Sequence, residues 1–190
     1  NEEDLVKYAF ALFLNHDFAK SLEVANMGLK KNPRHAAFNR LAMYNNTDLK
    51  RFEEALKAAD VFFNECDKAD YSYLDYMYYG HLLEELKKYD EAVGQYEKAV
   101  ELDPTKTDLY KNISSAYEQK NDYKKAIGAY HKYYSSLEKE KQTPDLQFQL
   151  GRLYYGAGTQ PDSLTINAEE RKQALICLLY TSPSPRDAHE

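Results

Sequence analysis

The stretch that decides the fold runs from residue 76 to residue 104, YMYYGHLLEELKKYDEAVGQYEKAVELDP. Its apolar residues recur every three or four positions over residues 76–83 and again over residues 92–100. This is the period of an amphipathic helix. The polar sequence LKKYD at residues 86–90 separates the two runs and predicts a tight turn. The stretch therefore predicts a pair of antiparallel helices.

The same pattern recurs along the chain. An aromatic residue followed three positions later by a small residue occurs with steps of 34, 37 and 34, at Phe18 and Ser21, Phe52 and Ala55, Tyr89 and Ala92, and Tyr123 and Ala126. A second set, Tyr79, Ile113 and Leu150, steps by 34 and 37. Two independent sets with one alternating step indicate an internal repeat of helix pairs. We expect units at about 2–34, 35–72, 73–106 and 107–143, and an incomplete unit at 144–176.

Prolines mark the ends of the expected helices. Asn32-Pro33 and Asp103-Pro104 close the second helix of a pair, because proline cannot continue the hydrogen-bond ladder. Thr143 followed by Pro144 reads as a cap and the first turn of the next helix.

The stretch 76–104 resembles the tetratricopeptide repeat family almost position for position, with Tyr76 where that family often has Trp. Weaker copies of the match extend over roughly residues 2–155. The resemblance implies an all-α fold, a right-handed superhelical solenoid of antiparallel helix pairs. In such a fold the 18 tyrosines are mainly packing residues: small residues such as Gly80 and Ala92 let helices approach, and rings such as Tyr96 fill the space between them.

The C-terminal part departs from the repeat. Ala174 lies 11 residues beyond the position that the spacing predicts for a small residue, so we expect an inserted polar loop at 158–167 and a helix from Ala168. Residues 177–190 break both the period and the composition, and they resemble a translated sequencing adaptor. We expect this tail to be non-native or disordered and the natural chain to continue with further repeats. The chain begins at Asn1, so a secretion signal would lie upstream.

Composition excludes several classes of function. The net charge is −6, with 25 Lys and Arg against 31 Asp and Glu, which argues against a nucleic-acid partner. No apolar run is long enough to span a membrane. Phosphate-loop, nucleophile-elbow and metal-binding motifs are absent, and none of the five histidines is paired at helical spacing. We therefore expect no enzyme activity, catalytic residue, cofactor or metal.

The resemblance places a ligand groove along the first helix of each unit. The matching positions are Val6, Phe10, Phe13, Asn39, Met43, Leu74, Met77, His81, Glu84, Asp108, Lys111, Ser115, Glu118, Phe148, Arg152 and Tyr155. Apolar anchors flanked by polar groups suit an extended or helical peptide. Each of these residues could equally be a solvated or packing contact. The basic clamp with which chaperone-binding members grip a peptide carboxylate is absent, although Arg152 and Lys111 could grip another anion.

The first hypothesis is a non-catalytic scaffold that binds a protein or peptide of unknown identity through this groove, in a bacterial protein. The second is a self-assembly module, because Leu146, Leu150 and Leu153 of the incomplete unit could join two copies as a homodimer. The third is an accessory domain of a longer protein. The cell envelope or periplasm and the cytoplasm are equal alternatives for the localisation.

Overall fold

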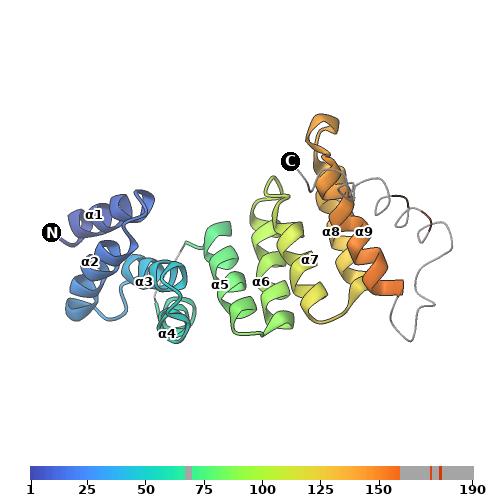
Figure 1. Ribbon diagram of the computed structural model, residues 1–190. Coiled ribbons are helices and arrows are strands. Elements are labelled where there is room, and N and C mark those ends of the chain that lie inside the picture. The colour runs from blue at the N-terminus through green and yellow to red at the C-terminus, as the bar shows by residue number, and fades with distance from the viewer. Residues whose placement is uncertain (67–69, 159–171, 173–175, 177–190) are drawn as a thin grey trace, which may run out of the picture. The chain divides into compact units, whose positions relative to one another are not determined.

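The computed structural model describes residues 1–66, 70–158, 172 and 176. Every regular element among them is a helix, as the all-α prediction requires. The helices are α1 (Glu2–Leu14), α2 (Phe18–Lys31), α3 (Ala36–Asp48), α4 (Phe52–Asn64), α5 (Tyr73–Glu85), α6 (Tyr89–Leu102), α7 (Leu109–Gln119), α8 (Tyr123–Ser136), a 3₁₀ turn η1 (Lys139–Lys141) and α9 (Pro144–Gly158). Two compact units make up the chain: unit 1 is Asn1–Asp103, with α1 to α6, and unit 2 is Pro104–Glu190, with α7 to α9. Figure 1 shows the helices of each unit side by side.

One turn geometry joins the two helices of four pairs. The residue two positions before the second helix has a positive φ in each, between 59° and 62°, at His16, Lys50, Lys87 and Asn121. After it, a backbone N–H donates to the carbonyl five residues earlier, as Lys88 does to Leu83 at 2.8 Å. This pattern satisfies carbonyl groups that a helix end leaves open. The turn predicted at residues 86–90 is confirmed.

The predicted helix ends are also confirmed. Helix α2 ends at Lys31 and α6 ends at Leu102, each two residues before a proline. Helix α9 begins at Pro144, and the carbonyl of Thr143 accepts from the N–H of Gln147 at 3.2 Å.

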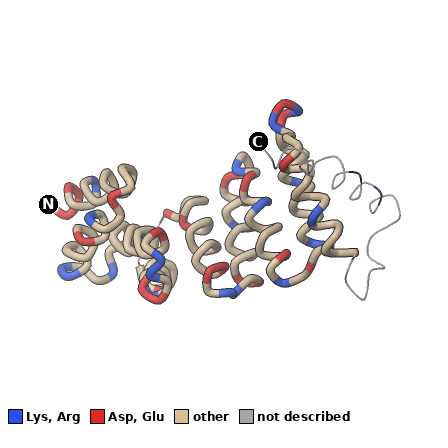
Figure 2. The backbone as a smooth tube through the Cα atoms, viewed as in Figure 1, with Lys and Arg blue, Asp and Glu red and all other residues tan. Residues whose placement is uncertain are grey.

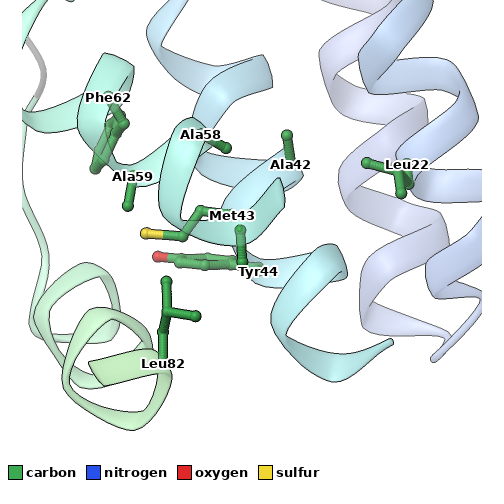
Figure 3. Packing of buried hydrophobic residues seen from close by; sticks show 9 residues of the cluster. Leu22, Ala42, Met43, Tyr44, Ala58, Ala59, Phe62 and Leu82 are labelled. Carbon is green, nitrogen blue, oxygen red and sulfur yellow. The ribbon is translucent and has the colours of Figure 1, made fainter. Parts of the chain in front are cut away.

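The core of unit 1 centres on α3. Met43 and Tyr44 are buried there with Phe62 of α4 and Leu82 of α5, and Figure 3 shows these side chains together with Ala58 and Ala59. Helix α3 contacts α1, α2, α4 and α5. It is therefore covered on nearly all sides, which explains why most of its residues are buried.

Glycines allow close helix packing within each unit. A Cβ on Gly80 of α5 would lie 2.7 Å from the ring of Tyr96 in α6, so only glycine fits there. Gly28 of α2 is covered by the ring of Phe38 in α3 in the same way. Tyr96 and Phe38 are fully buried, which agrees with the prediction that the aromatic residues are mainly packing residues.

In unit 2, α7, α8 and α9 pack through Ala126, Tyr130 and Tyr133 of α8 and Leu153 of α9. Leu146 and Leu150 are half-buried against this cluster, and Leu153 is buried. The homodimer predicted through these leucines stays a prediction. The sequence predicts an inserted loop, a helix from Ala168 and a tail within residues 158–190. The structure describes only residues 158, 172 and 176 of this range, so these predictions lie outside the described part of the chain.

Acidic and basic residues are interspersed along the helices of each unit (Figure 2). None of the described helices is both long enough and apolar enough to span a bilayer.

Candidate functional site

Three aromatic rings from three helices meet on one side of α3 in unit 1. The ring of Phe13 in α1 lies 5.4 Å from that of Tyr44 in α3, and Tyr44 stacks on Tyr78 of α5 at 4.2 Å between ring centroids. Phe13 and Tyr78 are 6.1 Å apart. We call Phe13, Tyr44 and Tyr78 the aromatic ladder. Phe10, which is 43% exposed and 6.1 Å from Phe13, extends it toward solvent.

Polar groups border the exposed edge of the ladder. The hydroxyl of Tyr78 donates to the carboxylate of Asp48 at 3.0 Å. Burial raises the pKa of Tyr78, and the nearby charge of Asp48 raises it further. Burial also raises the pKa of Asp48, although the Tyr78 hydrogen bond and the charge of His81 oppose that rise. His81 is exposed. The edge thus combines apolar rings with one carboxylate and one imidazole.

The other candidates of unit 1 divide into surface and interior residues. Met77 and Leu74 are half-buried, and Leu74 packs against the core. Glu84 accepts a hydrogen bond from the Tyr96 hydroxyl at 2.8 Å. Asn39 and Met43 are 4% and 0% exposed. These last two side chains therefore do not contribute to the exposed edge.

The sequence analysis did not include Tyr78 and Asp48 of the exposed edge, or Tyr44, which is 2% exposed and stacks on Tyr78. Tyr44 and Tyr78 are 34 residues apart, which is the step of the repeat. This spacing was the available signal, because residues one repeat apart on successive first helices come to lie side by side.

A buried ion pair joins α3 to α5 beside the ladder. Asp75 is fully buried and accepts from Arg40 Nε at 2.7 Å and from the Tyr44 hydroxyl at 2.7 Å. It also accepts from the backbone N–H and the hydroxyl of Ser72, at 2.7 and 3.0 Å. The Arg40 guanidinium lies 5.0 Å from the centre of the Phe62 ring. Burial and the negative charge of Asp75 raise the pKa of Tyr44, so its phenol stays protonated and fixed as a donor.

The unit 2 candidates largely contact one another or the core. Arg152 of α9 forms a two-pronged ion pair with Glu118 of α7, at 2.9 and 3.0 Å. The ammonium of Lys111 lies 5.4 Å from the centre of the Tyr133 ring. Since Glu118 already neutralises Arg152, an anion held by Arg152 and Lys111 would have to displace it. The others range from half-buried, at Ser115 and Phe148, to 61% exposed at Tyr155.

In the described residues no cluster of three or more His, Cys, Asp and Glu side chains has the arrangement of a metal site.

Comparison with known proteins supports the repeat. Residues 80–121 match the family described as TPR repeat, the tetratricopeptide repeat. No curated protein matches the sequence.

Solved structures share the fold at low sequence identity. The C-terminal part of a TPR repeat-containing protein from Cytophaga hutchinsonii is 24% identical, with a TM-score of 0.71 over 94% of this chain. The chain spans 65% of the length of that structure. A structure of MamA is 17% identical with a TM-score of 0.69, covering 97% of this chain and 95% of its own. YrrB, described as a TPR protein with an unusual peptide-binding site, is 14% identical with a TM-score of 0.73, covering 98% of this chain and 89% of its own.

The matched repeat and the shared all-α fold confirm the resemblance that the sequence indicated. Residues 80–121 match a tetratricopeptide repeat, and the described helix pairs share the fold of solved tetratricopeptide-repeat structures.

Proposed function

We propose that the chain is a protein-binding scaffold and that unit 1 binds a peptide along the exposed edge of the aromatic ladder. The observation that carries this proposal is the pair of half-buried rings Phe13 and Tyr78, which pack on the buried ring of Tyr44 beside the exposed ring of Phe10. Aromatic side chains at a surface bury a large apolar area with little loss of side-chain entropy, which suits them to anchor a partner.

The chemistry of the edge favours a basic peptide with an apolar anchor. Asp48 carries the nearby negative charge, and the exposed ring of Phe10 can attract Lys or Arg through a cation–π interaction. The peptide-binding description of YrrB, which shares this fold, agrees with such a role. The described candidates of unit 2 are mostly engaged with one another or with the core.

Binding to an array of capped dodecapeptides tests the proposal. Each peptide carries one Phe or Leu flanked by Lys and Arg, and a matched array carries Asp and Glu in place of the basic residues. We expect the basic array to bind, and Phe10→Ser to weaken binding about tenfold through lost apolar contact. Asp48→Asn should reduce the preference for the basic array.

Leu102→Ser is the matched control, because Leu102 is a 51% exposed apolar residue of unit 1 at the end of α6. It should leave binding unchanged. Equal loss in the Phe10 and Leu102 variants, or binding that survives Phe10→Ser, would contradict the proposal.

A further inference from the structure

We propose a second peptide site in unit 1, in the hollow between α2, α3 and α4, that takes an extended acidic segment. Two adjoining hollows, of about 680 and 350 Å³, share Leu22, Asn26, Leu29 and Arg51. These volumes fall in the range of ligand sites in proteins, roughly 300–1,000 Å³. The leucines provide an apolar floor, while the amide and the guanidinium supply polar contacts.

The side chain of Asn46 is the first reason to expect a ligand. Asn46 lines the smaller hollow and is only 6% exposed, yet its amide has no hydrogen bond to another described residue. Neither amide atom of Asn46 is among the fully buried atoms that lack a partner, so the amide reaches the hollow and is open to a ligand. Its N–H₂ and C=O groups together match the C=O and N–H of one peptide unit.

A second amide lies on the same face of α3. Asn39 also lines the hollow, and its Nδ2 donates to the carbonyl of Pro33 at 2.9 Å. Its Oδ1 accepts from none of the described groups. Seven residues separate Asn39 and Asn46, about 10.5 Å along a helix. Three residues of an extended chain cover about 10 Å, so a strand laid along α3 would present main-chain groups to both amides.

The charged residues that line the two hollows favour an acidic segment. Lys30, Arg51 and Lys57 line the hollows, and none of them forms an ion pair with a described residue. Glu23 and Glu54 are the acidic lining residues, so cations outnumber anions here in a chain whose net charge is −6. A peptide carboxylate near Arg51 would gain a charge-assisted hydrogen bond.

This site and the aromatic ladder lie on different sides of α3. Asn46 and Tyr44 are two residues apart, which is about 200° around a helix. The two sites can therefore be altered separately, and each can serve as the control for the other.

The test uses two arrays of N-acetylated, C-amidated heptapeptides. In one, Asp or Glu alternates with Leu, Val or Ser, and in the other Lys replaces every acid. We expect acidic peptides to bind the wild-type chain, and Asn46→Ala and Arg51→Gln each to weaken that binding about tenfold. Added salt should weaken it in the wild type and less so in Arg51→Gln. Phe10→Ser should leave it unchanged.

Folding of the variants is checked by circular dichroism. Asn46→Ala should retain the wild-type helix content, because its amide makes no hydrogen bond to lose. Arg51 is exposed, so Arg51→Gln tests the site even if the Asn46 variant unfolds.

Three outcomes would overturn the proposal: no acidic peptide binds, acidic and basic arrays bind equally at this site, or both variants bind acidic peptides like the wild type. A concentration-dependent mass that Asn46→Ala abolishes would assign the hollow to a second copy of the chain instead. A failure of this proposal can be told apart from a failure of the ladder proposal, because Phe10→Ser should weaken binding of the basic peptides alone.

Discussion

Helix α3 is held to its neighbours in unit 1 by two different kinds of contact. Toward α5 it carries a buried charge: Asp75 accepts five hydrogen bonds, from Arg40, Tyr44 and Ser72. Every one of these donors is satisfied by a single fully buried carboxylate.

Toward α2 the contact is neutral. The ring of Phe38 covers Gly28, and Asn45 Nδ2 donates to Ser21 Oγ at 2.8 Å. Ser21 in turn donates to the carbonyl of Ala9 at 2.8 Å. The Oδ1 of Asn45 is buried and has no partner.

The two contacts should respond differently to change. A buried ion pair loses far more when one partner is removed than its net contribution to stability, because the other charge is left buried. A neutral contact loses only the packing or the hydrogen bond that is deleted. The α3–α5 contact is therefore the one on which the order of unit 1 depends most sharply.

Asp75→Ala should have the largest effect. We expect a loss of about 3–5 kcal/mol in the free energy of unfolding, because Arg40 and Tyr44 lose a buried acceptor. Denaturant unfolding followed by circular dichroism measures the loss, and hydrogen exchange should locate it in α3 and α5.

Asp48→Asn is the matched control, since Asp48 is exposed and its replacement should change stability by less than about 1 kcal/mol. Replacing both partners, Arg40→Met with Asp75→Leu, should restore much of the loss. An Asp75→Ala variant as stable as the wild type would remove the distinction between the two contacts.

Gly28→Ala tests the neutral contact. The added methyl group would overlap the ring of Phe38, and we expect a loss of about 1–3 kcal/mol from overpacking. Gly94→Ala is the matched variant, because no atom lies within 4 Å of the added Cβ in the middle of α6. It should gain up to about 1 kcal/mol from helix propensity. A rise in the free energy of unfolding in Gly28→Ala, as in Gly94→Ala, would show that the Phe38 ring moves aside freely.

The sequence predicted the helices but only part of their contacts. Apolar period and proline positions determine where helices begin and end, and these are local properties of the chain. The left-handed turn residue was not predictable at Lys87, because lysine has no preference for a positive φ and the turn is imposed by the packing of the pair.

The polar contacts were missed because they join different repeats. Arg40 and Asp75 are 35 residues apart, and Glu118 and Arg152 are 34 apart. Opposite charges separated by one repeat length were therefore a signal that reading each helix by itself does not detect.

The candidate site was predicted in part for a related reason. Phe13 and Phe10 belong to α1, whose main packing partners are α2 and α3, so one side of α1 is less covered. Helix α3 contacts four helices, and this covers Met43 and Asn39. A residue that the pattern of one helix pair places on the groove surface becomes buried when the neighbouring pairs pack over it.

Alkaline pH should weaken the α3–α5 contact before the α2–α3 contact. The pKa of Tyr44 is raised in the folded chain, so its contribution is complete below the unfolded value near 10 and is lost as the pH rises above that value. One such group lowers stability by about 1.4 kcal/mol per pH unit in this range. Unfolding of wild type and Tyr44→Phe between pH 9 and pH 11 measures the difference. Tyr44→Phe should start less stable and show a shallower slope, whereas parallel slopes would mean that Tyr44 ionises without affecting the contact.

Asn45→Ala should have the smallest effect. The variant loses the hydrogen bond to Ser21, but it also removes the buried Oδ1 that has no partner, so the net change should stay within about 1 kcal/mol. Ser21→Ala is the informative comparison, because it leaves the whole Asn45 amide buried without a partner and should cost about 1–3 kcal/mol. Denaturant unfolding of both variants gives the order. If Asn45→Ala were the more damaging, the amide would contribute through packing rather than through its hydrogen bond, and the α2–α3 contact would depend on shape alone.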